Sequence, residues 1–439
     1  MAGCSAPRTA ARAPSPCRRP GHAPNAFRAG AGTLGRLEVV ARRVLISAGE
    51  MSGDLYAAGL VDALRRRNPD LEFFGCAGPR MQQAGVRAVV DSRSIAVVGL
   101  VEVITHIPRV YREYRKLVAA ARETRPDIAI LTDSPDFHLR LARQLKKLNI
   151  PVIYLVAPQV WAWRKGRLPL MRRTIDRLLC IFPFEPEFFA KNGIEATYIG
   201  HPLTRLVRAS ANREELRRRY GVSAGAPLVA LLPGSREGEA ARHLPVLLET
   251  VEGIRAGHGT PEPRFILAVP PGTVPAESIF WERISKASIQ VVEGETWDVL
   301  ACADLALAAS GTVTIEASLL GTPLIAFYRV NNLSWWMGRH LVQVPFYSMV
   351  NLVAGRRIVP ELIQNDLTAA RLADEALSLL ADPAARETMR RELRGVAEGL
   401  AGPEDPMELA ASLVEKNLTG APDRTSRLQP DTLTPVVRA

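Results

Sequence analysis

The chain alternates short, β-branched apolar runs with stretches of helical periodicity, and this alternation constrains the fold more than any other feature. Strands of about five residues that alternate with helices form parallel sheets, because each return to the same sheet edge needs a crossover helix. The sequence therefore predicts an α/β protein. The runs are "RVLIS", "LEFFG", "DIAILT", "PVIYLV" and "RLLCIF", followed by "PLVALL", "RFILAV", "SIQVV", "ADLALAA" and "TPLIAFY".

A chain of 439 residues exceeds what one hydrophobic core usually organises, so two domains are expected. The charged segment 204–227 separates the two groups of runs and ends in a Gly/Pro cluster, which favours an interdomain link. We expect a Rossmann-like domain over 41–205, a link over 206–226 and a second Rossmann-like domain over 227–400. Two doubly wound sheets bind ligands at the carboxyl ends of their strands, so the two domains should face one cleft.

Both ends of the chain have the composition of segments that lie outside a core. Residues 1–40 are rich in Ala, Pro, Gly and Arg, with Glu38 as their only acid, and they lack the apolar stretch of a secretory signal. They resemble a disordered or transit-like extension. A start codon assigned too far upstream of the true one would explain them equally well. Residues 401–439 are expected to be mostly disordered.

Composition excludes several classes of protein. No stretch approaches the roughly 20 apolar residues that span a bilayer. The five cysteines include no C-x-x-C pair and have no His at ligand spacing, so neither a disulfide framework nor structural zinc is expected, and a reducing cytoplasm suits the pattern. The net charge of +11 favours nucleic acid, an anionic membrane surface or phosphorylated substrates, without choosing among them.

Two loops of the second half have the character of an anion site. "LLPGSREGE" runs from an apolar strand into Gly234, Ser235 and Arg236, where Gly permits close backbone approach and the Arg fork suits phosphate oxygens. The alternative to an anion site is an ordinary strand-to-helix turn with a solvated Arg.

The second loop lies in "LALAASGTVTIEASLLGTPLIAFY". Ser310, Gly311 and Thr312 start a helix whose free N–H groups and dipole suit a diphosphate. Glu316, one turn later, could accept hydrogen bonds from a ribose diol, or be an exposed helix acid. Together the two loops favour a nucleoside diphosphate.

Acidic residues follow two strands of the first half. Asp133 and Asp136 bracket a Pro after "AILT", so Asp133 should project at the sheet edge as a general base, or the pair should cap a helix. In "AGEMSGD", Asp54 or Ser52 is expected to cap the next helix, which leaves Glu50 unexplained. A carboxylate there would repel a phosphate, so this loop is expected to bind a hydroxyl or position a base.

Two segments, 158–179 and 331–357, interleave aromatic and basic residues. Such composition suits an anionic membrane surface or acyl chains, although single-stranded nucleic acid and buried core helices are alternatives. The candidate membrane or acyl contacts are Trp161, Trp163, Arg164, Trp335 and Trp336.

No D-x-D pair is present to ligate a metal for a sugar nucleotide, so no metal is expected.

Taken together, these motifs resemble the lipid-A-disaccharide synthase family, which are inverting glycosyltransferases of the two-Rossmann GT-B architecture. The resemblance covers about residues 43–400 and rests on motifs that occur in the family's order. These are "AGEMSGD", "AGPRM", "VVGLVEV", "DSPDF", "APQVWAWR", "FPFE", "IGHPL", "LLPGSR", "ASGTVTIEA" and "MVNLVAGRR".

The resemblance implies a reaction and a set of roles. The family joins UDP-2,3-diacylglucosamine to 2,3-diacylglucosamine 1-phosphate, releases UDP and forms the β(1→6) disaccharide of lipid A in lipopolysaccharide biosynthesis. By resemblance Asp133 is the base and Glu50 assists, with Asp136 kept as an alternative base. Arg236 and the helix start at 310–312 would stabilise the leaving diphosphate without a metal or other cofactor.

The resemblance also implies a further donor-site residue and a cellular location. Asn351 belongs to the "NLVAGR" motif and would contact the donor, although Met349 and Val350 stand where the family pattern leads us to expect Leu-Pro. Acylated substrates imply a peripheral enzyme on the cytoplasmic face of the bacterial inner membrane.

Two other classes of function compete with this one. Other GT-B enzymes that use UDP-sugars, such as UDP-N-acetylglucosamine 2-epimerase or the peptidoglycan N-acetylglucosaminyltransferase, share the expected fold and donor site. They have little use for Trp residues beside basic ones on the acceptor side. A basic nucleic-acid-binding protein is disfavoured because the positive charge is dispersed and no recognition motif appears, so no nucleic-acid partner is expected.

Overall fold

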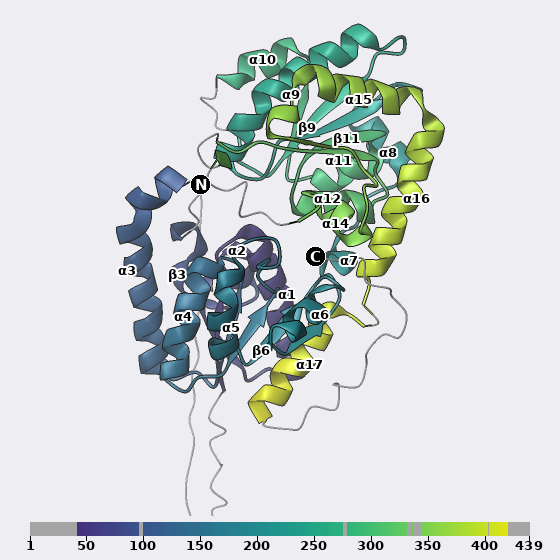
Figure 1. Ribbon diagram of the computed structural model, residues 1–439. Helices are drawn as coiled ribbons and strands as arrows, with labels where there is room; N and C mark the ends of the chain where they lie inside the picture. Colours follow the sequence, from purple (N-terminus) through teal and green to yellow (C-terminus); the bar gives the residue numbers. More distant parts are fainter. Residues whose placement is uncertain are drawn as a thin grey trace, which may run out of the picture. The chain divides into compact units, whose positions relative to one another are not determined.

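Two parallel β-sheets organise the chain, as the sequence predicts (Figure 1). The first sheet has seven strands in the order β3-β2-β1-β4-β5-β6-β7, and the second has six in the order β10-β9-β8-β11-β12-β13. The computed structural model describes residues 42–95, 100–274, 279–331, 335–336, 344–402 and 404–419, with the side chains of 100–106 left out. The expected extension over 1–40 lies outside the described residues.

All ten apolar runs are strands, and the α/β prediction is confirmed. The first sheet comprises β1 Arg43–Ser47, β2 Glu72–Ala77, β3 Arg87–Asp91, β4 Ile128–Thr132, β5 Val152–Leu155, β6 Arg177–Cys180 and β7 Ala196–Tyr198. The second comprises β8 Leu228–Leu232, β9 Arg264–Val269, β10 Gln290–Glu293, β11 Leu305–Ala309, β12 Leu324–Tyr328 and β13 Glu361–Ile363.

Three strands were not predicted, and all three lie at sheet edges. An edge strand is covered less completely than a central one, so β3, β7 and β13 lack the continuous apolar run of a strand buried on both faces. The central strands β4, β8 and β11, by contrast, are buried at every position.

Helices connect the strands and pack against the two sheets (Figure 1). Around the first sheet they are α1 Met51–Arg67, α2 Pro79–Gln83, α3 Leu100–Thr124, α4 Pro135–Lys147, α5 Leu168–Thr174 and α6 Glu185–Lys191. The later helices are α7 Leu203–Leu206, α8 Arg213–Arg219, α9 Glu237–Gly257, α10 Phe280–Lys286, α11 Thr296–Cys302, α12 Thr312–Leu319, α14 Met349–Ala354, α15 Ala369–Ala381, α16 Pro383–Leu400 and α17 Pro406–Thr419. Among the described residues, no helix is long and apolar enough to cross a lipid bilayer.

The strand orders place the candidate loops at the points where ligands bind such sheets. The direction of winding reverses between β1 and β4 in the first sheet and between β8 and β11 in the second. In open parallel sheets, ligands bind beyond the carboxyl ends of the strands at this reversal. The loops that follow these four strands are 48–50, 133–134, 233–236 and 310–311, which are the loops that the sequence singles out.

The chain end returns to the first sheet, and the expectation of disorder does not hold for residues 406–419. Within 401–439, which was expected to be mostly disordered, α17 packs along α1. A Cβ on Gly59 of α1 would lie 3.3 Å from Met407 Cγ, and Arg66 and Arg67 pair with Glu408. An acid followed by Pro is a helix-start signal, because Asp405 Oδ1 accepts from the N–H of Met407 at 2.9 Å. Residues 420–439 lie outside the described residues.

The two passages of the chain between the sheets touch each other. The first passage leaves β7 through Gly200, which has a φ of +83°, and the second leaves α16 through Gly402. A Cβ on Gly200 would lie 2.9 Å from Gly402 N, so only glycine fits at this contact. The N–H of His201 donates to the carbonyl of Leu400 at 3.0 Å, which closes the crossing.

The expected link over 206–226 contains α8, which is attached to the second sheet. Arg213 and Arg217 of this helix pair with Asp304 at 2.6 and 3.0 Å, just before β11 begins. The exact domain boundaries stay a prediction.

We predict that α17 contributes to the stability of the first sheet. A chain that ends at Gly402 loses the burial of Met407, Leu413 and Val414, and we expect its free energy of unfolding to fall by about 3 kcal/mol or more. Urea denaturation monitored by circular dichroism measures this. A chain that ends at Thr419 is the control and should match the full chain, whereas equal stability of all three chains would contradict the prediction.

Candidate functional site

The centre of the site is the carboxylate of Asp133, which lies at the amino end of α1. The N–H of Gly49 donates to Asp133 Oδ1 at 2.8 Å, and the N–H of Glu50 donates to Oδ2 at 3.0 Å. Each oxygen thus binds one amide of the loop after β1, at the positive end of the helix dipole. An acid from the loop after the neighbouring strand β4 therefore occupies the position that a capping side chain would take.

The expectation that Asp54 or Ser52 caps α1 was wrong, because no side chain of the loop caps this helix. The Asp54 carboxylate is buried and accepts from the N–H groups of Arg80 at 3.0 Å and Met81 at 3.1 Å. It therefore holds the start of α2, and the amino end of α1 is left to Asp133.

Two glycines of "AGEMSGD" make room for this carboxylate. A Cβ on Gly53 would lie 1.7 Å from Asp133 Oδ2, and a Cβ on Gly49 would lie 2.4 Å from Ser134 Oγ. Both distances are far below van der Waals contact. The glycines of this loop are therefore required for close approach to an acid, and not for approach to a phosphate.

The backbone at Asp133 is held in an unusual conformation by side chains beneath it. Asp133 and the next residue, Ser134, have φ values of +52° and +34°, which non-glycine residues rarely adopt. The Asp133 carbonyl accepts from the hydroxyl of Tyr154 at 2.5 Å and from His138 Nδ1 at 3.0 Å. Because a carbonyl only accepts, Nδ1 carries the proton, and Nε2 accepts from the Ser47 hydroxyl at 2.7 Å. Burial lowers the pKa of His138 to about 4, so it is neutral at physiological pH.

The pKa of the Asp133 carboxyl is raised to about 8. Burial is the largest cause, since only 11% of the side chain is exposed, and the like charge of Glu50 adds to it. The N–H groups of Gly49 and Glu50 oppose the shift by stabilising the charged form. A carboxyl with a pKa in this range can accept a proton near physiological pH.

Glu50 connects this loop with the second sheet. Its carboxylate pairs with Arg236 Nη2 at 2.8 Å, and both side chains are about two-fifths exposed. Arg236 is the last residue before α9 and follows β8. The structure therefore brings together an acid expected on the sugar side and a cation expected on the phosphate side.

The loop after β8 is organised by an acid that the sequence analysis missed. Glu239, in the first turn of α9, accepts from the N–H of Ser235 at 3.2 Å. Gly234 has a φ of +119°, and a Cβ on it would lie 2.3 Å from Glu239 Oε2. A Glu in the first helical turn that reaches back to the preceding backbone is a capping signal that could have identified it. The amide of Ser235 is thus already occupied, which leaves Arg236 as the candidate for binding an anion in this loop.

The loop after β11 leaves a helix start open. Gly311 precedes α12, no side chain caps this helix, and a Cβ on Gly311 would meet no atom within 4 Å. The Ser310 hydroxyl donates to the carbonyl of Tyr347 at 2.8 Å, which fixes the residue before the helix. The first N–H groups of α12, beginning with that of Thr312, can therefore donate hydrogen bonds to an anionic ligand.

Glu316 lies one turn into α12, but it is not an exposed helix acid. Its Oε2 accepts from Trp297 Nε1 at 3.1 Å, and burial raises its pKa to about 7. Among the residues that the structure describes, none donates a hydrogen bond to Oε1, so a hydroxyl could still bind there.

Asn351 is placed differently from the expectation. It is fully buried, so the structure does not support direct contact with a donor. Its Oδ1 accepts from the N–H groups of Ile358 and Val359 at 2.7 and 3.0 Å, and its Nδ2 donates to the carbonyl of Val359 and to Glu361 Oε1. The amide therefore holds the turn between α14 and β13.

The first aromatic and basic segment divides into a buried part and an exposed part. Trp161, expected at the surface, is only 8% exposed and donates to buried Glu185 at 3.0 Å, so this expectation was wrong. Trp163 is 39% exposed, and the guanidinium carbons of Arg164 and Arg167 lie 4.5 and 5.4 Å from its ring centroid.

In the second segment, Trp336 is 67% exposed, whereas the Trp335 ring lies 6.2 Å from that of Tyr347. Residues 332–334 and 337–343 of this segment lie outside the described residues.

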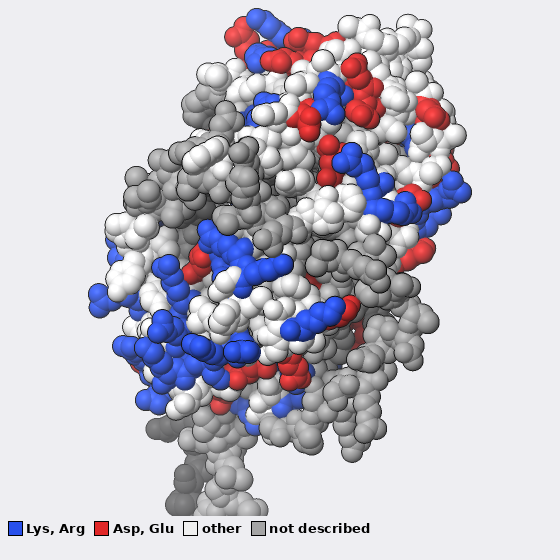
Figure 2. Space-filling model, in the orientation of Figure 1, with Lys and Arg blue, Asp and Glu red and all other residues white. Residues whose placement is uncertain are grey.

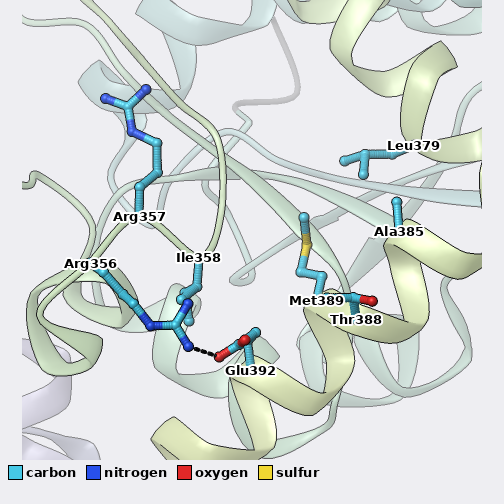
Figure 3. Close-up of a pocket in the computed structure, with 8 residues that line it drawn as sticks. All are labelled: Arg356, Arg357, Ile358, Leu379, Ala385, Thr388, Met389 and Glu392. Carbon is cyan, nitrogen blue, oxygen red and sulfur yellow. Dashed lines mark hydrogen bonds and ion pairs between the residues drawn. The ribbon is translucent and has the colours of Figure 1, made fainter.

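A pocket of about 330 Å³ lies on the second sheet, away from these loops (Figure 3). Met389, which lines it, contacts the N–H of Leu324 at the amino end of β12. Arg356 and Glu392 form an ion pair at its rim (Figure 3). Because ligands of such sheets bind at the carboxyl ends, this pocket is not the candidate site.

Among the described residues, no group of three His, Cys, Asp or Glu side chains is arranged to hold a metal ion. The expected independence from metal stays a prediction that only activity measurements can test.

Sequence comparison identifies the family. Residues 44–404 match the family model described as lipid-A-disaccharide synthetase. The chain belongs to the lipid-A-disaccharide synthase family. It is 56% identical over 378 residues to the lipid-A-disaccharide synthase of Solibacter usitatus, and the aligned residues make up 86% of this chain and 98% of that protein. It is 43% identical over 358 residues to the lipid-A-disaccharide synthase of Myxococcus xanthus, and the aligned residues make up 81% of this chain and 92% of that protein.

Membership of the family establishes the activity as that of a lipid-A-disaccharide synthase, a glycosyltransferase of lipid A biosynthesis. Solved structures support the GT-B fold. A UDP-GlcNAc 2-epimerase from Neisseria meningitidis bound to UDP-GlcNAc has a TM-score of 0.57 at 12% identity and covers 86% of this chain and 100% of its own. The calicheamicin glycosyltransferase CalG4 has a TM-score of 0.52 at 17% identity, and the match covers 88% of this chain and 99% of CalG4. At these identities the likeness concerns the fold alone.

We predict that Gly53→Ala displaces the Asp133 carboxylate and lowers kcat. The added methyl overlaps Oδ2, and a displacement of about 1 Å costs roughly a hundredfold in rate. Steady-state turnover measures this, with Gly395→Ala as control because Gly395 is also helical and a Cβ there meets no atom within 4 Å. An unchanged kcat in folded Gly53→Ala would show that the position of this carboxylate does not limit turnover.

Proposed function

We propose that Asp133 is the general base of a transfer from UDP-2,3-diacylglucosamine to 2,3-diacylglucosamine 1-phosphate. Asp133 takes the proton of the acceptor's 6-hydroxyl as this oxygen attacks the anomeric carbon of the donor. The bond from that carbon to the β-phosphate oxygen breaks, UDP leaves, and the β(1→6) disaccharide 1-phosphate forms. The observation that carries this role is the Asp133 carboxylate, held by two amides at the carboxyl edge of the first sheet.

Several features support this role for Asp133 over Glu50 and Asp136. Its pKa of about 8 lies near the operating pH, which is where a base acts most efficiently. Glu50 is paired with Arg236, and its proposed role is to assist by setting the charge around Asp133. Asp136 is mostly exposed and paired with two arginines, which suits a salt bridge better than proton transfer.

For the donor, we propose that Arg236 and the amino end of α12 bind the diphosphate of UDP. Negative charge grows on the β-phosphate as UDP leaves, and fixed donors at that point stabilise the transition state without a metal. The open helix start after Gly311 and the guanidinium of Arg236 support this assignment. Gly234 and Ser235 shape the loop, and Glu316 is proposed to accept a ribose hydroxyl.

A membrane surface is the proposed site of action, on the cytoplasmic face of the inner membrane. Lys and Arg side chains gather over α3, α4 and α5 (Figure 2). Exposed apolar side chains lie among them, including Ile107 and Tyr111 of α3, which are 53% and 59% exposed, and Trp163. Tyr111 contacts Tyr114, whose ring contacts Phe137 at the start of α4. Apolar groups between cations suit an anionic bilayer, where acyl substrates reside.

We predict that Asp133→Asn lowers kcat by a hundredfold or more while UDP still binds, because the amide keeps the shape of the carboxylate but cannot accept the proton.

In the parent, kcat/KM should rise with pH through about 8, since only the ionised carboxylate is a base. Glu50→Gln removes a like charge, lowers the pKa of Asp133 and moves this rise to lower pH. Stopped assays across a pH series, with calorimetry for UDP, measure both effects.

The control for this prediction is Asp136→Asn, which should keep the position of the pH rise. Of the other groups near Asp133, His138 is already neutral in this range, and burial raises the pKa values of Tyr154 and Cys76 far above it. The rise therefore reports the Asp133 carboxyl, on which Glu50 acts through its charge. Near-normal turnover in folded Asp133→Asn would transfer the role of base to Glu50 or Asp136.

We predict that a chain beginning at residue 41 sediments with anionic vesicles and that this binding falls as salt rises. Tyr111→Ser combined with Trp163→Ser removes exposed aromatic surface that the bilayer would bury, and should weaken binding roughly tenfold or more. Ile279→Ser is the matched control, because Ile279 is 83% exposed but belongs to the second sheet's α10 region. If the parent never sediments, or if the double variant binds as the parent does, the membrane proposal is wrong.

A further inference from the structure

We propose that Arg164 and Arg167 form the binding subsite for the 1-phosphate of the acceptor sugar. The proposal rests on the assignment of Asp133 as the base, because that assignment fixes where the acceptor's 6-hydroxyl lies. It gives a function to a cluster of side chains that neither the base nor the donor site uses.

Both guanidinium groups converge on one carboxylate at the surface. Arg164 Nη1 contacts the two oxygens of Asp136 at 3.0 and 2.8 Å, and Arg167 Nη2 contacts Oδ1 at 2.5 Å. Asp136 itself is 67% exposed. Guanidinium groups that bind a carboxylate in this way present donors suited equally to phosphate oxygens.

The surroundings keep these two cations in place. The Trp163 ring lies against both guanidinium groups, which limits the directions in which they can turn. Arg164 has a φ of +58°, a left-handed conformation that a non-glycine residue adopts at a cost and that is concentrated at functional sites. Arg167 is only 13% exposed, so its charge is screened less by water than that of a surface arginine.

The cluster is linked to the base through the start of α4. Asp136 follows Asp133 by three residues, in the first turn of α4. Arg167 influences the hydroxyl of Tyr154, which donates to the Asp133 carbonyl. The acceptor carries its reacting hydroxyl on C6, which is bonded to C5, and its phosphate on C1, and C5 and C1 are the two carbons that flank the ring oxygen. With the hydroxyl at Asp133, the phosphate must therefore be bound nearby, and these arginines supply the charge.

Asp136 would occupy the subsite when no acceptor is bound. Its carboxylate keeps two close cations from repelling each other, and its exposed side chain can rotate away when a phosphate arrives. A phosphate carries more negative charge and more acceptor oxygens than a carboxylate, so it competes well for two guanidinium groups.

The test compares two acceptors in neutral detergent micelles. One is 2,3-diacylglucosamine 1-phosphate, and the other is the same sugar with a free 1-hydroxyl. The variants are Arg164→Ala and Arg167→Ala, with Arg172→Ala as the matched control because Arg172 is an exposed arginine of the nearby α5. We expect the two test variants to lower kcat/KM for the phosphorylated acceptor by roughly tenfold to a hundredfold. The value for the unphosphorylated acceptor, the KM for the donor and the control should change little.

This comparison is a double-mutant cycle in which one change is made on the substrate. Equal losses with both acceptors would show that the arginines only support the fold, and would overturn the proposal. Arg164 is more exposed than Arg167, so Arg164→Ala keeps the test decisive if Arg167→Ala fails to fold. Failure of the base assignment is distinguishable, because Asp133→Asn lowers turnover with both acceptors alike.

A second measurement separates the substrate phosphate from a lipid headgroup. The same variants are sedimented with vesicles of anionic phospholipid in the absence of substrate. Parent-like vesicle binding together with lost discrimination between the acceptors is the expected result. Weakened vesicle binding with unchanged discrimination would place the two arginines on lipid headgroups and overturn the subsite.

Discussion

The contact between the Asp133 carboxylate and the amino end of α1 is the interaction on which the rest of the site depends. It joins the loops after β1 and β4, the two strands between which the first sheet reverses its winding. Three requirements meet there. The loop must contain glycines at 49 and 53, the backbone at 133 must be left-handed, and its carbonyl must be held by Tyr154 and His138. A charged group so enclosed has its pKa set by its neighbours more than by its own chemistry.

Sequence analysis predicted the sheets because their strands are buried on both faces and therefore read as continuous apolar runs. It also identified the loops at the carboxyl ends, since Gly, Ser and acidic residues after an apolar strand are a local signal. Three of the edge strands, β3, β7 and β13, and also α17 were missed for the opposite reason. Their burial depends on packing against other elements, and α17 acquires its partner α1 only in the folded chain.

Individual side chains were harder to assign than loops. Asn351 and Trp161 have the residue types of a ligand-binding amide and an interfacial aromatic, yet each is buried and hydrogen-bonded within its own region. The partner that distinguishes the two cases, a turn near β13 or the acid Glu185, is set by tertiary structure. For the same reason the sequence could not show that Asp133, and not Asp54, faces the amino end of α1.

The glycine contact at positions 200 and 402 bears on how substrates enter. Both passages of the chain between the sheets lie together at this contact, and no side chain separates them. Two adjacent connections form a pivot, about which the sheets can rotate while neither connection is stretched, whereas two distant connections would resist such rotation. A hinge of this kind suits an enzyme whose two lipid-bearing substrates must both reach one edge, because the path for bulky acyl chains can widen without unfolding either sheet.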